Sequence, residues 1–63
     1  MDKTLQYVIE EISQKYNVDI SEACVIVESS FFPEMLEEMP DYVHHYTAEY
    51  WAKEIMEDKG GTI

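Results

Sequence analysis

Apolar residues recur at steps of three and four along most of this chain, which is the spacing of one face of an α-helix. The segment from about residue 2 to residue 16 shows the pattern most clearly. Its apolar stripe consists of Leu5, Val8, Ile9, Ile12 and Tyr16. Asn17 follows, and asparagine accepts the left-handed backbone conformation in which many helices end. The sequence therefore predicts a first helix that buries one face and stops near Asn17.

Three further segments have helical stripes and recognisable ends. The second opens at Asp19, and Glu22 three residues later resembles a capping box. Pro33 fits the first turn of a third helix, and Pro40 ends or redirects that helix. Thr47 is a good N-cap for the last helix. The stripes are Ala23, Ile26, Val27 and Ser30; Phe32, Met35, Leu36 and Met39; and Ala48, Trp51, Ala52, Ile55 and Met56.

Other parts of the chain fit the pattern less well. The run Val25-Ile26-Val27 is β-branched and suits a strand equally by propensity, but the clear helix start before it favours a helix. Residues 40–46 are expected to form a short turn or a loop. Residues 60–63 begin with two glycines, a typical helix stop, and are expected to fray. We therefore expect one all-α domain, residues 1–63, with three to four short helices around one core.

The predicted core is small. A chain of 63 residues buries only about 60% of the surface that its unfolded form exposes. The residues expected to be largely buried are Leu5, Val8, Ile9, Ile12, Ala23, Val27, Leu36, Trp51, Ala52 and Ile55. Cys24 is the single cysteine, so it forms no disulfide within the chain. We expect a buried structural thiol there, because Glu22 and Glu28 disfavour the reactive thiolate.

Charge limits the range of partners. Fourteen carboxylates face four lysines, and the formal net charge is -10. The lack of a basic patch disfavours direct binding to nucleic acid or to an anionic membrane, whereas a basic protein would be attracted. The alternative is that the charge only keeps a small domain soluble. Two groups of acids are candidates for an acidic surface: Glu34, Glu37, Glu38 and Asp41, and Glu54, Glu57 and Asp58.

Arrangements that carry catalysis or bind metals are scarce. Asp41, His45 and Glu49 have the i, i+4, i+8 spacing of one helix face. A helix start at Thr47 would break this alignment, and the adjacent His44 and His45 match no recognised zinc spacing. The sequence also has no glycine-rich loop and no nucleophile motif. We therefore expect a protein that is not an enzyme and that holds no metal or cofactor.

The densest aromatic stretch lies between residues 40 and 51. Tyrosine and tryptophan dominate the hot spots of protein interfaces. The predicted protein-binding residues are Tyr42, His45, Tyr46, Glu49 and Tyr50. The alternative is that these rings fold inward to complete an undersized core, and for Trp51 we favour the core.

Two short segments resemble a group of short, uncharacterised helical proteins of bacteria and their mobile elements, including prophage-type small acidic proteins. They are Ile20-Ser21-Glu22-Ala23 and His45-Tyr46-Thr47-Ala48-Glu49-Tyr50-Trp51. That group has no established chemistry, so the resemblance implies no site residues. The small size and high acidity also look like those of phage proteins that block host enzymes, some of them by imitating DNA.

These features lead to a functional expectation. We expect a small acidic protein-binding module that acts as an adaptor or stoichiometric inhibitor. One alternative is a DNA mimic that inhibits a nucleic-acid-binding protein. Another is a purely structural domain that forms a homodimer and binds no ligand. We expect a cytoplasmic protein, because the chain shows no membrane-length apolar run or signal pattern and its single cysteine fits a reducing compartment.

Overall fold

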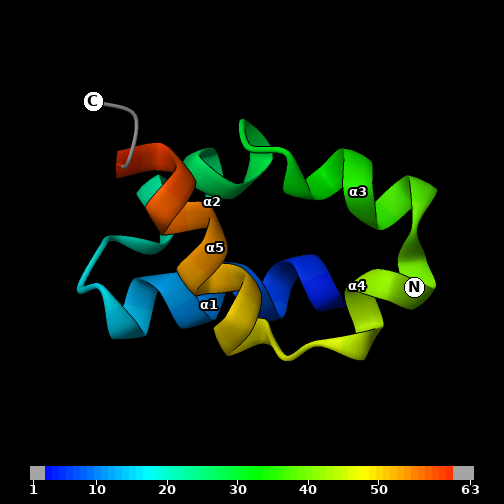
Figure 1. The fold of residues 1–63 in the computed structure, drawn as a ribbon. Helices are drawn as coiled ribbons and strands as arrows, with labels where there is room; N and C mark the ends of the chain where they lie inside the picture. Colours follow the sequence, from blue (N-terminus) through cyan, green and yellow to red (C-terminus); the bar gives the residue numbers. More distant parts are fainter. Residues whose placement is uncertain (1–2, 61–63) are drawn as a thin grey trace.

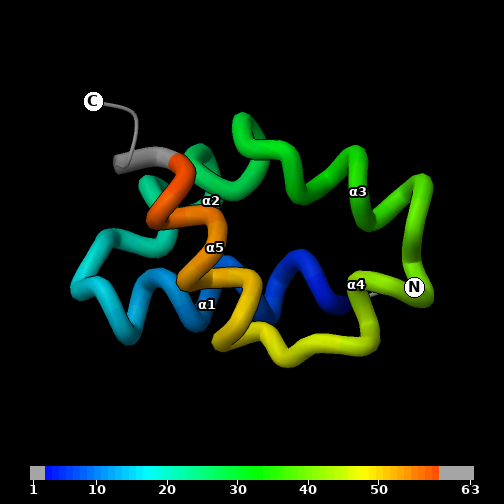
Figure 2. The backbone as a smooth tube through the Cα atoms, in the orientation of Figure 1, coloured from blue at the N-terminus to red at the C-terminus, as the bar shows by residue number. Residues whose placement is uncertain are grey.

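The computed structural model describes residues 3–60, which form five α-helices and no strand (Figure 1). The helices are α1 (Thr4–Lys15), α2 (Ile20–Glu28), α3 (Phe32–Glu38), α4 (Pro40–His45) and α5 (Ala48–Gly60). The all-α prediction is confirmed, with one helix more than expected. Helix α1 packs mainly against α5 and α2. Helices α3 and α4 contact each other and form a corner on the right of Figure 2, where the chain reverses sharply.

The first helix ends as its sequence predicts. Asn17 has a backbone φ of 56°, and among the described residues it is the one non-glycine with a positive φ. This conformation turns the chain out of α1 and towards α2. Glu11 and Lys15 form an i,i+4 ion pair on the outer face of α1, with 4.0 Å between the carboxylate oxygen and Nζ.

Helix α2 confirms the helical interpretation of Val25-Ile26-Val27, but not the expected capping box. Asp19 stands at the N-cap position with extended backbone, and its side chain makes no capping hydrogen bond. The other end of α2 is closed by two serines. Ser29 Oγ donates to the Val25 carbonyl at 2.6 Å, and Ser30 Oγ donates to the Val27 carbonyl at 2.6 Å.

Residues 40–46 correct the expectation of a turn or loop, because Pro40–His45 form helix α4. Proline is acceptable in the first turn of a helix, where its missing N–H has no partner to lose. Asp41 in the first turn also complements the helix dipole. Val43 is fully buried and anchors this short helix to the core.

The core lies where the five helices meet. Its buried residues are Val8, Ile12, Ala23, Ile26, Val27, Phe32, Val43, Trp51, Ala52 and Ile55. The predicted core residues Leu5, Ile9 and Leu36 are only partly buried and pack against its edge. Met39 is 48% exposed, because α3 ends at Glu38 and Met39 lies beyond the helical stripe.

Helix α5 continues through Gly60, where the two glycines predict a stop. The remainder of the predicted frayed tail, residues 61–63, lies outside the described residues. Within residues 3–60, no helix is both long and apolar enough to cross a membrane.

Candidate functional site

The buried side chain of Trp51 lies at the base of the aromatic region. Its side chain is 3% exposed, and its indole N–H donates to the Val43 carbonyl at 2.8 Å. The ring centroids of Phe32 and Phe31 lie 5.5 Å and 6.5 Å from that of Trp51. These contacts join α5 to the corner formed by α3 and α4. A further hydrogen bond, 2.9 Å between Thr4 Oγ1 and the Nε2 atom of His44, ties the start of α1 to α4.

Four rings form what we call the aromatic surface: Tyr42, Tyr46 and Tyr50, which contact the ring of Trp51, and His45, which contacts Tyr46. Tyr46 is its centre. It stacks on Tyr50 with centroids 4.3 Å apart and an interplanar angle of 19°. It meets Tyr42 edge-on at 5.5 Å and His45 edge-on at 4.9 Å. Because edge-to-face and offset-stacked rings attract one another, the cluster holds its members in fixed relative positions.

The aromatic surface is open to solvent. Tyr42 is 46% exposed and Tyr46 is 37% exposed. His45 is also exposed, and Tyr50 is half-buried. The degree of burial differs as expected within this stretch, with Trp51 in the core and the other rings more exposed. Each ring therefore has one part packed on the protein and another part available for contact.

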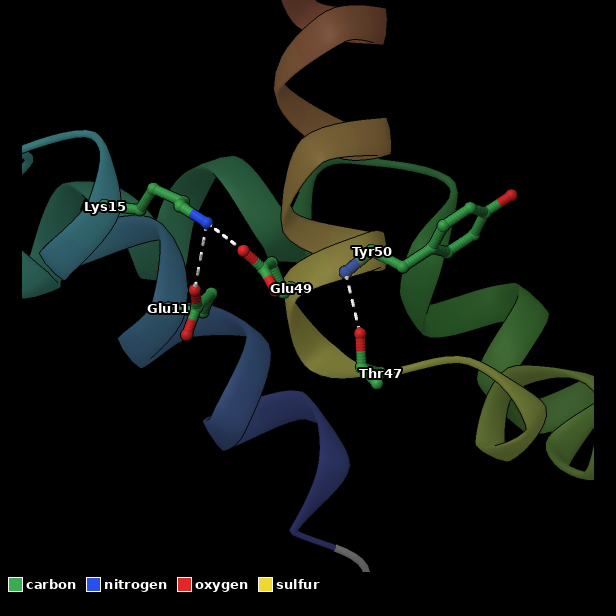
Figure 3. A network of polar contacts seen from close by, with 5 residues as sticks. All are labelled: Glu11, Lys15, Thr47, Glu49 and Tyr50. Carbon is green, nitrogen blue, oxygen red and sulfur yellow. Dashed lines mark hydrogen bonds and ion pairs between the residues drawn. The ribbon is translucent and has the colours of Figure 1, made fainter.

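Glu49 points away from these rings. Figure 3 shows the Glu49 carboxylate directed towards Lys15 of α1, while the ring of Tyr50 points to the opposite side of α5. The structure therefore brings together the four aromatic residues of the predicted site but not its acid. The partner of Glu49 is Lys15, which is 34 positions away in the sequence.

The Lys15–Glu49 pair connects the end of α1 to the start of α5. The hydrogen bond from Lys15 lowers the pKa of the Glu49 carboxyl, and the same bond raises the pKa of Lys15. The N-cap prediction for Thr47 is confirmed, because its Oγ1 accepts the Tyr50 N–H at 3.2 Å (Figure 3). These contacts fix the first turn of α5 and so position Tyr50.

Tyr50 has a raised pKa, chiefly because packing removes water from its phenol, with smaller contributions from Glu54, Tyr42 and Tyr46. The neutral phenol is therefore the stable form at physiological pH. A neutral tyrosine offers an O–H group for hydrogen bonding beside an apolar ring, which suits a protein contact.

A hollow of about 580 Å³ is lined mainly by residues of α5 and by Lys15 and Tyr16 at the end of α1. Lys15, Lys53, Glu49 and Glu57 contribute to its lining, together with Tyr16 and Tyr50. Two cations and two anions give this hollow a balanced charge, so its electrostatics favour neither an anionic nor a cationic ligand.

The alignment of Asp41, His45 and Glu49 does not form in the structure. Helix α4 ends at His45, and the next residue, Tyr46, is extended with φ of -111° and ψ of 162°. Glu49 therefore belongs to a separate helix with a different direction. Among residues 3–58, no three histidine, cysteine or acidic side chains are grouped to hold a metal ion.

Cys24 is half-buried, which corrects the expectation of a buried thiol. It lies on α2 between the inner and outer faces, and its Sγ donates to the Glu28 carboxylate at 3.4 Å. This hydrogen bond is the main cause of a raised pKa for the Cys24 thiol, followed by desolvation. The thiol form is therefore favoured over the reactive thiolate, as the neighbouring acids predict.

The two predicted acidic groups lie on different parts of the molecule. Glu34, Glu37, Glu38 and Asp41 belong to α3 and α4, and Glu54, Glu57 and Asp58 belong to the second half of α5. In Figure 1, α3 and the end of α5 stand on opposite sides of the view. All seven are exposed except Glu54, which is half-buried.

Comparisons with protein-family models, with curated proteins and with solved structures return no match for this chain. The resemblance to prophage-type small acidic proteins therefore stays a prediction. The site itself is a fixed cluster of partly exposed rings on a strongly acidic domain.

Proposed function

We propose that this protein is a small protein-binding module that contacts a basic partner through the aromatic surface. It acts by stoichiometric contact, as an adaptor or inhibitor, rather than by catalysis. One observation carries the proposal: Tyr42 and Tyr46 stay exposed although their ring centroids lie 5.9 Å and 5.7 Å from that of the buried Trp51. Partly exposed aromatic rings of this kind are typical anchors of protein interfaces.

The ring contacts favour tight binding because they order the surface before a partner arrives. Tyr46 touches Tyr42, His45, Tyr50 and Trp51 through ring centroid distances of 4.3–5.7 Å. Side chains that are already held in place lose less conformational entropy when an interface forms. Tyrosine adds large contact area with few rotatable bonds.

Charge supports a basic partner in preference to a second copy of the chain. The formal net charge of -10 attracts a cationic surface over several ångströms and speeds its approach. Two copies of this protein would repel each other for the same reason. The half-buried Cys24, which is the single cysteine, fits a reducing, cytoplasmic setting.

The test compares partner capture by wild-type protein with capture by Tyr46→Ala and Tyr42→Ala. Tyr7→Ala is the matched control, because Tyr7 is a 54% exposed tyrosine on α1, outside the aromatic surface. A hot-spot tyrosine is worth at least about 2 kcal/mol, so its loss should weaken binding about 30-fold. Tyr7→Ala should leave the affinity unchanged.

Thermal unfolding of each variant separates binding from folding. Tyr42 has the more exposed ring of the two tyrosines, so Tyr42→Ala should remain folded and still lose affinity. Equal affinities for the wild type, Tyr42→Ala and Tyr7→Ala would contradict the proposal. Loss of stability with undiminished capture by the folded fraction would assign the rings to the core instead. A captured nucleic-acid-binding protein that is released when the acids of α3 and α5 are neutralised would favour DNA mimicry.

A further inference from the structure

A second surface feature lies between α2 and α5, away from the aromatic surface. It is a groove of about 330 Å³, comparable in size to the smallest ligand pockets. Ile26 and Ile55 form its apolar floor and are 8% and 1% exposed. Val25 belongs to the same lining and is 64% exposed, the highest value among the large apolar side chains that the structure describes. Glu22 of α2 and Asp58 of α5 are exposed acids at the same groove.

The polar groups in the groove are acceptors rather than donors. The hydroxyls of Ser29 and Ser30 both line it, but each donates its proton to a carbonyl of α2 at 2.6 Å. Ser30 Oγ also accepts the Phe32 N–H at 3.1 Å. Within residues 3–58, Glu22 and Asp58 take part in no ion pair or hydrogen bond. A ligand in the groove therefore meets an apolar floor with two unneutralised carboxylates beside it.

We propose that this groove binds one long cationic side chain, lysine or arginine, from a basic partner segment. Such side chains lay their methylene stem along apolar surface and keep the charged head in water. Here the stem covers Val25, Ile26 and Ile55, and the head reaches the carboxylates of Glu22 and Asp58. A purely apolar residue would leave these carboxylates without a counter-charge. A second copy of this chain would bring further negative charge to an acidic rim.

The proposal is independent of the aromatic surface, because the two sites share no residue. Together they would give a basic partner two contact points on one small domain. The groove can be tested alone with short peptides, so its failure would leave the proposed function of the aromatic surface untouched.

The test is an NMR titration of the whole protein with acetyl-Gly-Lys-Gly-amide. Two peptides serve as controls, one with norleucine and one with 2,4-diaminobutyric acid in place of lysine. Norleucine keeps the stem without the charge, and diaminobutyric acid keeps the charge on a shorter stem. We expect saturable shifts at Val25, Ile26 and Ile55 with the lysine peptide. The norleucine peptide should bind up to about fivefold more weakly, from one lost ion pair, and the diaminobutyric acid peptide about fifteenfold more weakly, from two lost methylenes.

Substitutions in the protein then test which residues of the groove contact the lysine peptide. The double change Glu22→Gln and Asp58→Asn should weaken the lysine peptide about threefold to tenfold. The double change Glu34→Gln and Glu37→Gln on α3 removes the same charge away from the groove and should change the affinity less than twofold. Val25→Ser alters an exposed residue and should weaken binding without unfolding the protein.

Four results would overturn the proposal. The first is an absence of saturable shifts at the groove with the lysine peptide. The second is norleucine binding as tightly as lysine, which would make the groove a purely apolar site. The third is an equal loss of affinity in both double variants, which would assign the effect to net charge. The fourth is a concentration-dependent dimer in sedimentation that protects Val25, which would make a second copy the occupant.

Discussion

Replacing Trp51 by phenylalanine tests the contact on which the aromatic surface rests. The change removes the indole N–H that donates to the Val43 carbonyl at 2.8 Å, and it shortens a ring that is 3% exposed. The Val43 carbonyl keeps a second donor, the Tyr46 N–H at 3.3 Å, so it is not left without a partner. The expected loss of folding free energy therefore comes from the missing hydrogen bond and from the space left by the smaller ring.

The size of the stability loss in Trp51→Phe follows from these two contributions. The hydrogen bond is worth about 1 kcal/mol, and the partial loss of a buried aromatic ring about 1–2 kcal/mol. The sum, about 2–3 kcal/mol, is a large share of the stability of a 63-residue domain, which is about 3–9 kcal/mol at typical values per residue. The melting temperature should fall by about 10–20 °C.

Circular dichroism at 222 nm during heating and urea titration measures this loss, since the variant lacks the tryptophan needed for fluorescence. Tyr7→Phe on the exposed face of α1 serves as the control and should change stability by less than about 0.5 kcal/mol. A loss below about 0.5 kcal/mol in Trp51→Phe would refute the reasoning, because it would mean that α4 and α5 are not held together through Trp51.

Three further predictions concern local contacts. Asn17→Ala should lose about 1 kcal/mol in urea unfolding, because alanine disfavours the positive φ at this position, whereas Asn17→Gly should lose none. Thr47→Ala removes the N-cap of α5 and should cost about 1 kcal/mol in the same assay. The Lys15–Glu49 pair predicts a pH window for the stability difference between wild type and Glu49→Gln. The pKa of Glu49 is lowered on folding, so the difference is present at neutral pH and disappears as pH falls through that lowered pKa. The pKa of Lys15 is raised, so the difference also disappears as pH rises through that raised pKa, and a pH series of urea titrations that shows no such window would contradict the pair.

Helical periodicity was sufficient to predict α1, α2, α3 and α5, because each carries an apolar stripe several residues long. It missed α4, which has six residues and one fully buried side chain, Val43. A single apolar position defines no period. The helix instead depends on Pro40 at its first turn and on the contact of Val43 with Trp51, eight residues further on.

The aromatic surface could be predicted from the sequence because its members lie within nine positions of one another. The direction of Glu49 could not, since its partner Lys15 is 34 positions away. The same limit applies to the groove between α2 and α5. Val25 and Ile55 are far apart in the sequence, and only the packing of the two helices brings them together. Local spacing therefore located the rings but not the contacts made by tertiary structure.

Hydrogen exchange tests the central claim most directly once a partner has been captured. We predict that amides of residues 40–50 exchange more slowly in the complex than in the free protein, because the partner covers the aromatic surface. Amides around the exposed Tyr7 on α1 should exchange at the same rate in both states. Unchanged exchange over residues 40–50, together with protection around Tyr7, would contradict the claim that the aromatic surface is the binding site.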